Sequence, residues 1–192
     1  HDKGDFGTAL DYFERSLAIA EELGDKRWKG ILLANIGLVR KDKGDFGTAL
    51  DYLEKSLVIV EELGDKAGKG AALNNIGIVY GNKGDFDTAL DYMERSLAID
   101  EEVGNKAGKG SVLNNIGLEY LHKGDYEKAL DYYDRSFAIA EELNAKRLMG
   151  ATLTGLGFLY LNKGGLDTAL DYMERSLAIA EELGDKRGMG RS

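Results

Sequence analysis

The chain has 192 residues, no cysteine, no proline and a formal net charge of −9 at pH 7. Without cysteine it can form neither a disulfide framework nor a thiolate metal site, and a reducing compartment fits this composition, so we expect a cytoplasmic protein. The acidic balance argues against nucleic acid as a partner, and the absence of any apolar run near the ~18 residues of a membrane span argues against a membrane.

A heptapeptide recurs with small changes every 40 residues along the chain. Its copies begin at Gly4, Gly44, Gly84, Gly124 and Gly164. A fixed period of this length is typical of repeat proteins, in which each unit buries its apolar face against its neighbours. We expect residues 1–192 to form a single array. Because the first residues resemble the end of a repeat, we also expect the sequence to be part of a longer protein.

Each repeat is predicted to be a helical hairpin, with a first helix, A, and a second helix, B. In chain order the expected elements are an unpaired helix B at 5–23, four hairpins at 25–63, 65–103, 105–143 and 145–183, and the start of a further helix A at 185–192. Because such an array would expose apolar surface at both ends, we expect end-to-end association of copies.

Helix B carries the clearer periodicity. Ala89, Met93 and Leu97 recur at the i, i+4, i+8 spacing of one helix face. Asp85 stands at the expected N-cap, and Gly104 stands where a left-handed residue should end the helix.

Helix A carries a glycine inside its apolar pattern, as in Leu73, Ile76, Gly77 and Tyr80. A glycine within a helix costs about 1 kcal/mol relative to alanine. Because the glycine recurs in all four hairpins, we expect it to allow close approach of helix A to helix B of the same hairpin.

The pattern Leu-x2-Ile-Gly-x2-Tyr, followed by Ala89 twelve residues after the glycine, resembles the tetratricopeptide repeat. The period of 40 residues and a glutamate in place of the family's proline resemble its long-period subclass, which includes Pins-type scaffolds, kinesin light chains and peptide-sensing bacterial regulators. The resemblance implies an all-α fold, a right-handed superhelical solenoid of antiparallel helix hairpins with a concave groove.

The resemblance also places a series of asparagines of helix A on the groove. A carboxamide both donates and accepts, so it can pair with a peptide N–H and C=O. The candidate amides are Asn35, Asn74, Asn75, Asn114 and Asn115. The candidate apolar floor is Ile31, Leu38, Ile78, Leu118, Leu121, Phe158 and Leu161. The alternative is that the amides bond to neighbouring helices and that some apolar members belong to the core. The amide series stops at Thr154-Gly155.

The remaining polar groups do not form a catalytic or metal-binding pattern. His122 has no serine or cysteine partner in the sequence pattern, and the lysines at the helix A starts alternate with acids, which favours a solvated edge. Trp28 is either an anchor for a partner or a cover for the N-terminal end. We therefore expect no catalytic residue, no metal and no cofactor.

The sequence thus predicts a non-enzymatic scaffold that binds a protein or peptide segment in its groove. Two alternatives remain open. One is a repeat scaffold that assembles with itself through its ends, and the other is a sensory module of a larger signalling protein.

Overall fold

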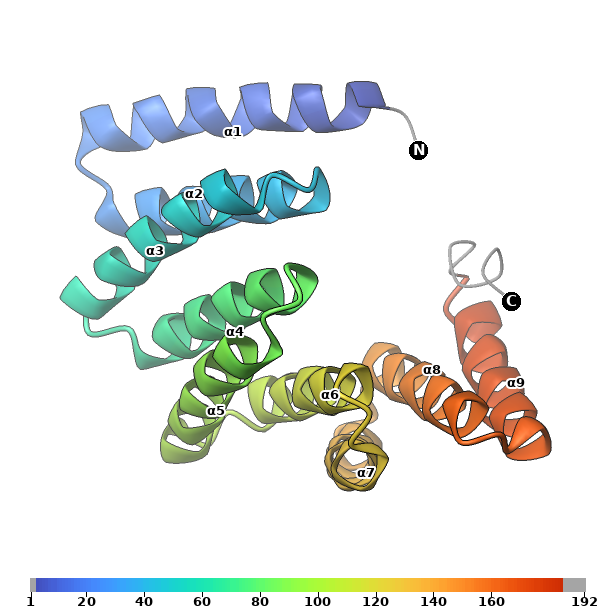
Figure 1. Cartoon of the computed structure of the whole chain (residues 1–192). Coiled ribbons are helices and arrows are strands. Elements are labelled where there is room, and N and C mark those ends of the chain that lie inside the picture. Colours follow the sequence, from blue (N-terminus) through green and yellow to red (C-terminus); the bar gives the residue numbers. More distant parts are fainter. Residues whose placement is uncertain (1–2, 185–192) are drawn as a thin grey trace. The chain divides into compact units, whose positions relative to one another are not determined.

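The computed structural model describes residues 3–184, which form nine α-helices and no strand (Figure 1). The helices are α1 (Lys3–Leu23), α2 (Lys26–Asp42), α3 (Phe46–Glu62), α4 (Lys66–Asn82), α5 (Phe86–Val103), α6 (Lys106–His122), α7 (Tyr126–Glu142), α8 (Lys146–Asn162) and α9 (Leu166–Glu182). The all-α class is confirmed. The helix predicted at 185–192 lies outside the described residues.

The chain divides into two compact units, residues 1–99 and residues 100–192. In the first unit α1 packs on α2, α2 on α3 and α3 on α4. In the second unit α6 packs on α7, α7 on α8 and α8 on α9, and α6 also contacts α8. Both units therefore show the same packing arrangement, in which a helix B packs between helix A of its own hairpin and helix A of the next hairpin.

The helix ends follow from residues that the sequence identifies. The Oδ1 atom of Asp85 accepts a hydrogen bond from the backbone N–H of Thr88 at 3.2 Å, which is the predicted N-cap. Gly104 has a φ of 69° and ends its helix in the left-handed conformation as expected, and Asn144, with a φ of 48°, does the same at the corresponding position of the next repeat. The N-cap residues of α8 and α9 are Ala145 and Gly165, and neither helix has a side-chain cap hydrogen bond.

The helix A glycines lie where the two helices of a hairpin touch. A Cβ on Gly77 would lie 2.9 Å from Cγ of Met93 and 3.0 Å from the carbonyl oxygen of Ala89. Gly37, Gly117 and Gly157 meet the facing helix B at similar distances. The close approach expected from the sequence is therefore confirmed, and these glycines are required by packing rather than by backbone dihedral angles.

A serine of helix B joins the two helices of each hairpin, and it is buried in the first three hairpins. The Oγ of Ser96, which is fully buried, donates to the carbonyl oxygen of Gly70 at 2.7 Å. The same bond recurs in the other hairpins at Ser56–Gly30, Ser136–Gly110 and Ser176–Gly150. In α1, which has no preceding helix A among the described residues, Ser16 donates instead to Tyr12 of its own helix.

We predict that Ser96→Ala lowers the free energy of unfolding by about 1 kcal/mol, because a buried hydrogen bond between two helices is lost. Ser16→Ala is the matched control, since its bond is local and exposed, and should change stability by less than about 0.5 kcal/mol. Urea denaturation followed by circular dichroism measures both. Equal values for the two variants would contradict the structural role of the serine.

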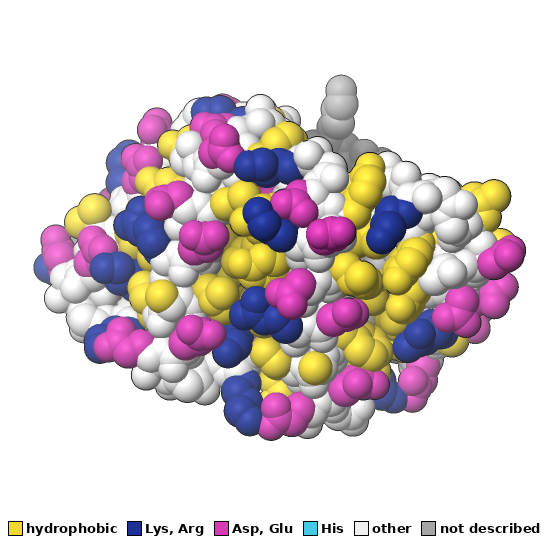
Figure 2. Space-filling model, turned by 60° about the horizontal axis from the view of Figure 1, so that its bottom comes forward, with side chains coloured by type: hydrophobic (Ala, Val, Ile, Leu, Met, Phe, Trp, Pro, Cys, Tyr) yellow, Lys and Arg dark blue, Asp and Glu magenta, His cyan; other side chains and the backbone are white. Residues whose placement is uncertain are grey.

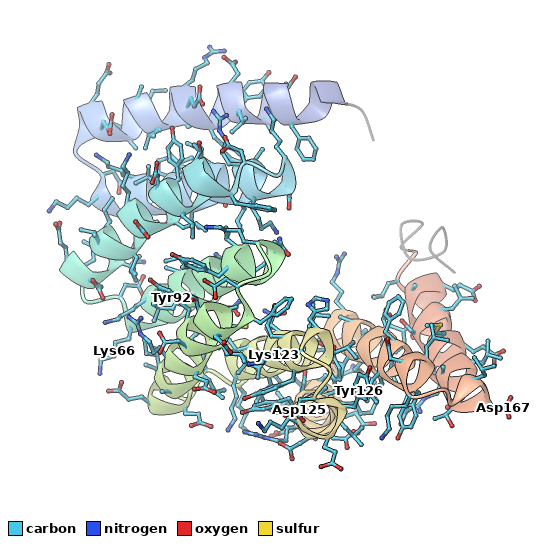
Figure 3. The ribbon with its side chains drawn as sticks, viewed as in Figure 1. Lys66, Tyr92, Lys123, Asp125, Tyr126 and Asp167 are labelled. Atoms are coloured by element: carbon cyan, nitrogen blue, oxygen red, sulfur yellow. The ribbon has the colours of Figure 1, made fainter. Side chains whose placement is uncertain are left out.

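Stacked tyrosines cover the other end of the hairpin contact. Tyr92, which Figure 3 labels on α5, stacks on Tyr80 with ring centroids 5.6 Å apart. The guanidinium of Arg95 lies 5.0 Å above the Tyr92 ring. Equivalent stacks join Tyr120 to Tyr132 and Tyr160 to Tyr172. Because each ring face is occupied by another ring or a cation, these tyrosines stabilise the hairpin and are not a free aromatic surface.

Candidate functional site

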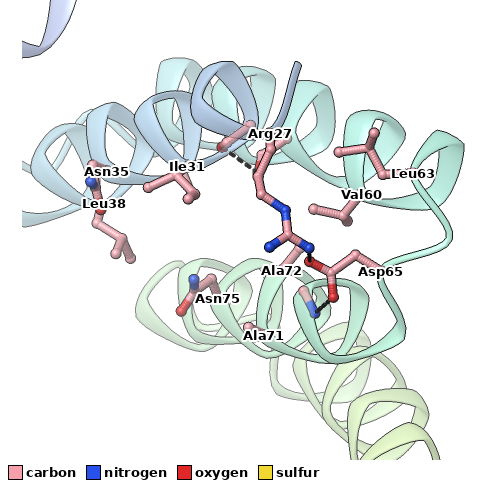
Figure 4. A pocket seen from close by; sticks show the side chains of 14 residues that line it. Arg27, Ile31, Asn35, Leu38, Val60, Leu63, Asp65, Ala71, Ala72 and Asn75 are labelled. Atoms are coloured by element: carbon pink, nitrogen blue, oxygen red, sulfur yellow. Dashed lines mark hydrogen bonds and ion pairs between the residues drawn. The ribbon is translucent and has the colours of Figure 1, made fainter. Parts of the chain in front are cut away.

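The first unit contains an open apolar pocket between α2, α3 and α4, with a volume of about 240 Å³ (Figure 4). Ile31 and Leu38 of α2, Val60 of α3 and Leu63, which follows α3, form much of its wall, and Ala71 of α4 lies at its floor. A small residue on α4 keeps the hollow open, because a larger side chain there would fill it. The volume is below the roughly 300 Å³ of small-molecule sites, and it suits one amino-acid side chain.

Two carboxamides lie on the rim of this pocket. Asn35 of α2 and Asn75 of α4 both line it, and both are partly exposed. Within residues 3–184 neither carboxamide makes a hydrogen bond to the protein. Each therefore keeps its donor and acceptor for another molecule. The structure thus brings four predicted site residues together, Ile31, Asn35, Leu38 and Asn75.

An ion pair lies across the mouth of the pocket. The guanidinium of Arg27 is 3.7 Å from Oδ2 of Asp65, whose Oδ1 also accepts from the backbone N–H of Gly68 (Figure 4). The two opposite charges offset one another, so the pocket itself carries no net charge. An exposed pair of this kind adds at most about 1 kcal/mol to stability.

The basic residues at the helix starts are paired, as the interleaved acids predict. Lys26 contacts Glu62 and Lys29 contacts Glu21, each at 2.8 Å. Figure 2 shows the same mixture over one face of the molecule, where lysine and arginine alternate with aspartate and glutamate and form no single-sign area.

The asparagines of the second unit are engaged within the protein. Oδ1 of Asn114 accepts a hydrogen bond from Oγ1 of Thr152 at 3.1 Å, which ties α6 to α8. Asn115 and, in the first unit, Asn74 also interact with neighbouring groups. For Asn114 the structural alternative raised from the sequence therefore holds.

The apolar members of the predicted floor divide in the same way. Leu118 of α6 is 38% exposed, and Phe158 and Leu161 of α8 are 48% and 45% exposed. Leu121, in contrast, is buried in the core cluster of the second unit with Ala129, Tyr133, Leu156 and Leu159. The assignment of Leu121 to an open surface is therefore wrong, because its side chain turns into the core. Ile78 is partly buried on α4 and is not among the residues that line the pocket.

A second hollow lies between α8 and α9, with a volume of about 340 Å³. Its lining residues stand three repeats after those of the first pocket, with Arg147 in the place of Arg27 and Thr154 in the place of Ala34. The hydroxyl groups of Thr154 and Ser176 both approach the carbonyl oxygen of Gly150. This hollow is more polar than the first and carries no unpaired amide.

Three buried groups were not identified from the sequence. Asp100 is 3% exposed, and its Oδ1 accepts from the amide of Asn105 at 2.7 Å. Burial raises the pKa of the Asp100 carboxyl, and the Asn105 bond partly offsets this. Glu119 is 4% exposed, and burial raises its pKa to about 7. The third group is Tyr133, whose buried hydroxyl has no hydrogen-bond partner within residues 3–184.

Each of these residues departs from the repeat pattern at its position, which is the signal that could have found it. Asp100 and Glu119 stand where sister repeats have Val60 and Val79. Asn105 stands where the previous repeat has Asp65 as N-cap. An amide is required there because a second carboxylate 2.7 Å from Asp100 would meet a like charge.

His122 and Trp28 lie outside the pocket of the first unit. Nδ1 of His122 is 3.9 Å from the buried carboxylate of Glu119, one helical turn earlier. Trp28 is 47% exposed. It is not among the residues that line the pocket.

Comparison with known proteins places these features in a family. The sequence profile of the tetratricopeptide repeat matches residues 1–62 and 68–142, and a second tetratricopeptide repeat profile matches residues 150–183. A search of curated protein sequences found no match.

Solved structures show the same fold at low sequence identity. BtubC (BKLC) from P. vanneervenii has a TM-score of 0.76 at 22% identity, over 95% of this chain and 76% of its own. A Rap protein complexed with Competence and Sporulation Factor has a TM-score of 0.88 at 19% identity, over 97% of this chain and 52% of its own. The STAND protein PH0952 from Pyrococcus horikoshii, which has a tetratricopeptide repeat sensor, has a TM-score of 0.73 at 23% identity, over 91% of this chain and 28% of its own.

The chain thus spans about half of that Rap protein and less than a third of the STAND protein. Among the described helices, none combines the length and the hydropathy that crossing a bilayer requires.

Proposed function

The chain belongs to the tetratricopeptide repeat family, and from that premise we propose that its first unit binds an extended peptide segment of a partner protein. The observation that carries this proposal is the pairing of two unbonded carboxamides, Asn35 and Asn75, on one apolar pocket. The amides would hold the peptide backbone, and the pocket would hold one uncharged side chain. The Rap protein complexed with a factor supports a binding role for this fold.

The proposal also follows from the absence of net charge at the pocket. Arg27 and Asp65 offset one another, and the wall is aliphatic. A charged side chain would lose hydration there without gaining an unpaired counter-ion, whereas an aliphatic side chain gains about 25 cal/mol for each Å² removed from water. We therefore expect the anchor residue of the partner to be aliphatic.

Blocking the pocket tests this proposal. Ala71 is exposed on α4 and lines the pocket, so Ala71→Trp should fill the hollow and lower affinity for a pocket-bound peptide by roughly tenfold or more. The probe is a peptide enriched from a displayed random library on the wild-type protein, with affinity measured by fluorescence anisotropy. Ala98→Trp, at an exposed alanine of α5 outside the pocket, is the matched control.

Removing the amides tests the backbone contact separately. The double variant Asn35→Ala, Asn75→Ala should lower the affinity for the same peptide by about ten- to a hundredfold, since each lost hydrogen bond is worth about 1 kcal/mol. Asn82→Ala, at the exposed end of α4, should leave affinity unchanged. If affinity is insensitive to both Ala71→Trp and the double variant, the first unit is not the binding site.

A second candidate function, self-assembly, is favoured by the apolar surface of α9. Leu170 is 59% exposed, although Leu50, at the same position of α3, is only 9% exposed because the next helix A covers it. We predict that the wild-type protein increases in mean mass with concentration and that Leu170→Glu abolishes the increase, as measured by sedimentation. Val58→Glu, at a residue 53% exposed on α3, is the control. A mass that stays monomeric at all concentrations would exclude self-assembly.

A third candidate function is that of a sensory module in a larger signalling protein. It is supported by the similarity to the STAND protein that has a tetratricopeptide repeat sensor. It is compatible with peptide binding, because a sensor also needs a ligand site.

A further inference from the structure

The counterpart of the pocket in the second unit holds a side chain of the protein itself. Leu148 of α8 stands two repeats after Gly68 of α4, which lines the pocket of the first unit. A Cβ on Gly110 of α6 would lie 2.8 Å from Cδ2 of Leu148. In the part of the chain that the structure describes, a Cβ on the equivalent Gly30 of α2 would meet only Ile59 within 4 Å beyond its own stretch of helix. The first unit is therefore open where the second unit holds a leucine methyl group.

Two further positions decide whether a leucine fits there. A Cβ on Gly68 would lie 2.9 Å from Cγ of Asp65 and 3.0 Å from Cγ1 of Val60, so these side chains leave no room for a larger residue on α4. In the second unit both counterparts are short, namely Ala145 and Ala140. The absence of a side-chain cap at Ala145 therefore belongs to the same change, because it makes room for the leucine of α8.

A hydrogen bond also occupies the counterpart in the second unit. Oγ1 of Thr152 donates to Oδ1 of Asn114 at 3.1 Å. These two residues stand at the positions of Ala72 and Ala34, which line the pocket of the first unit. The second unit thus fills this place in two ways, with a leucine and with a bonded amide, whereas the first unit has only glycine and alanine at the same positions.

We propose that Gly68 determines the specificity of the pocket and that the side chain it accepts from a partner peptide is leucine. This inference rests on the proposed peptide-binding function and names its anchor residue. Leu148 shows that two facing helices of this repeat pack around a leucine side chain at this place. The mutual offset of Arg27 and Asp65 leaves the pocket without net charge, which matches an uncharged anchor. A leucine of the peptide would fill the open space beside Gly30.

Closing the pocket from within tests the role of Gly68. The triple variant Val60→Ala, Asp65→Ala, Gly68→Leu gives the first unit the residues of the second. The matched control is Val60→Ala, Asp65→Ala, Gly68→Ala, which differs from it only in lacking the larger side chain. A peptide enriched from a displayed random library on the control should bind the leucine variant at least about tenfold more weakly, as measured by fluorescence anisotropy. Equal affinities for the two variants would overturn the proposal.

Thermal unfolding of the same two variants reports the packing without a peptide. Leucine and alanine have similar helix propensities, so the comparison isolates the filling of the pocket. The leucine variant should melt about 2–4 °C or more above the alanine control, because burying the leucine side chain stabilises the folded protein. A lower melting temperature for the leucine variant would show that the space does not take a leucine side chain, and it would overturn the proposal.

Peptides enriched on the wild-type protein test the identity of the anchor. They should share a leucine at one position, and its replacement by alanine should lower affinity about ten- to a hundredfold. An aromatic or charged residue at the shared position would overturn the assignment of leucine. The failure of the proposed function has a different signature, since no enriched peptide would then lose affinity in the Asn35→Ala, Asn75→Ala variant.

Discussion

Replacing Glu119 by leucine is expected to stabilise the protein by about 3 kcal/mol at pH 8 and by much less at pH 4.5. Burial raises the pKa of the Glu119 carboxyl from 4.5 to about 7 in the folded protein. Between these values the folded protein holds a proton that the unfolded chain has released, so stability falls as pH rises from about 4.5 to about 7 and then levels off. A difference of about 2.5 pKa units corresponds to about 3 kcal/mol.

Leucine is a suitable replacement because Leu159 is fully buried at the same position of α8. The measurement is urea denaturation of both proteins across this pH range. Glu94→Leu, at an exposed glutamate of α5, is the control and should shift stability by no more than about 0.5 kcal/mol at either pH. A wild-type-minus-variant difference that does not change with pH would show that Glu119 is not protonated in the folded protein.

The periodic features of the fold could be predicted from the sequence because they are local and repeated. The helix ends depend on residues such as Asp85 and Gly104, whose preferences act over a single turn. The packing role of Gly77 could be inferred because a recurrent cost inside a helix needs a compensating contact. These preferences are weak in a single hairpin, and the prediction gains strength because the same residues recur at the same positions of each hairpin.

The candidate site could be predicted only in part. The face of α2 that carries Ile31, Asn35 and Leu38 follows from helical spacing. Whether an amide is unbonded does not follow from spacing: Asn114 is bonded because Thr152 of α8 stands opposite it. The burial of Leu121 likewise depends on neighbours from other helices.

The departures from the repeat show what distinguishes the hairpins from one another. Asn105 compensates for the charge of Asp100, and Gly155 compensates for the size of Tyr133. In each case two positions change together because they are in contact. Comparing one position across repeats shows a departure, but only the structure shows which second position accommodates it. The repeats therefore share one packing scheme but differ in the particular contacts that each hairpin makes.

Gly77→Ala is expected to destabilise the protein by about 2 kcal/mol, although alanine is the better helix former. The gain of about 1 kcal/mol in helix propensity is outweighed because the added methyl group would lie 3.0 Å from the carbonyl oxygen of Ala89, a backbone atom that cannot rotate away. The matched control is Gly47→Ala in α3, where no atom lies within 4 Å of the new Cβ. That variant should gain about 0.5–1 kcal/mol. Denaturation curves of the two variants should therefore shift in opposite directions. A gain in stability for Gly77→Ala would contradict the close contact, in which a Cβ at residue 77 lies 3.0 Å from the carbonyl oxygen of Ala89.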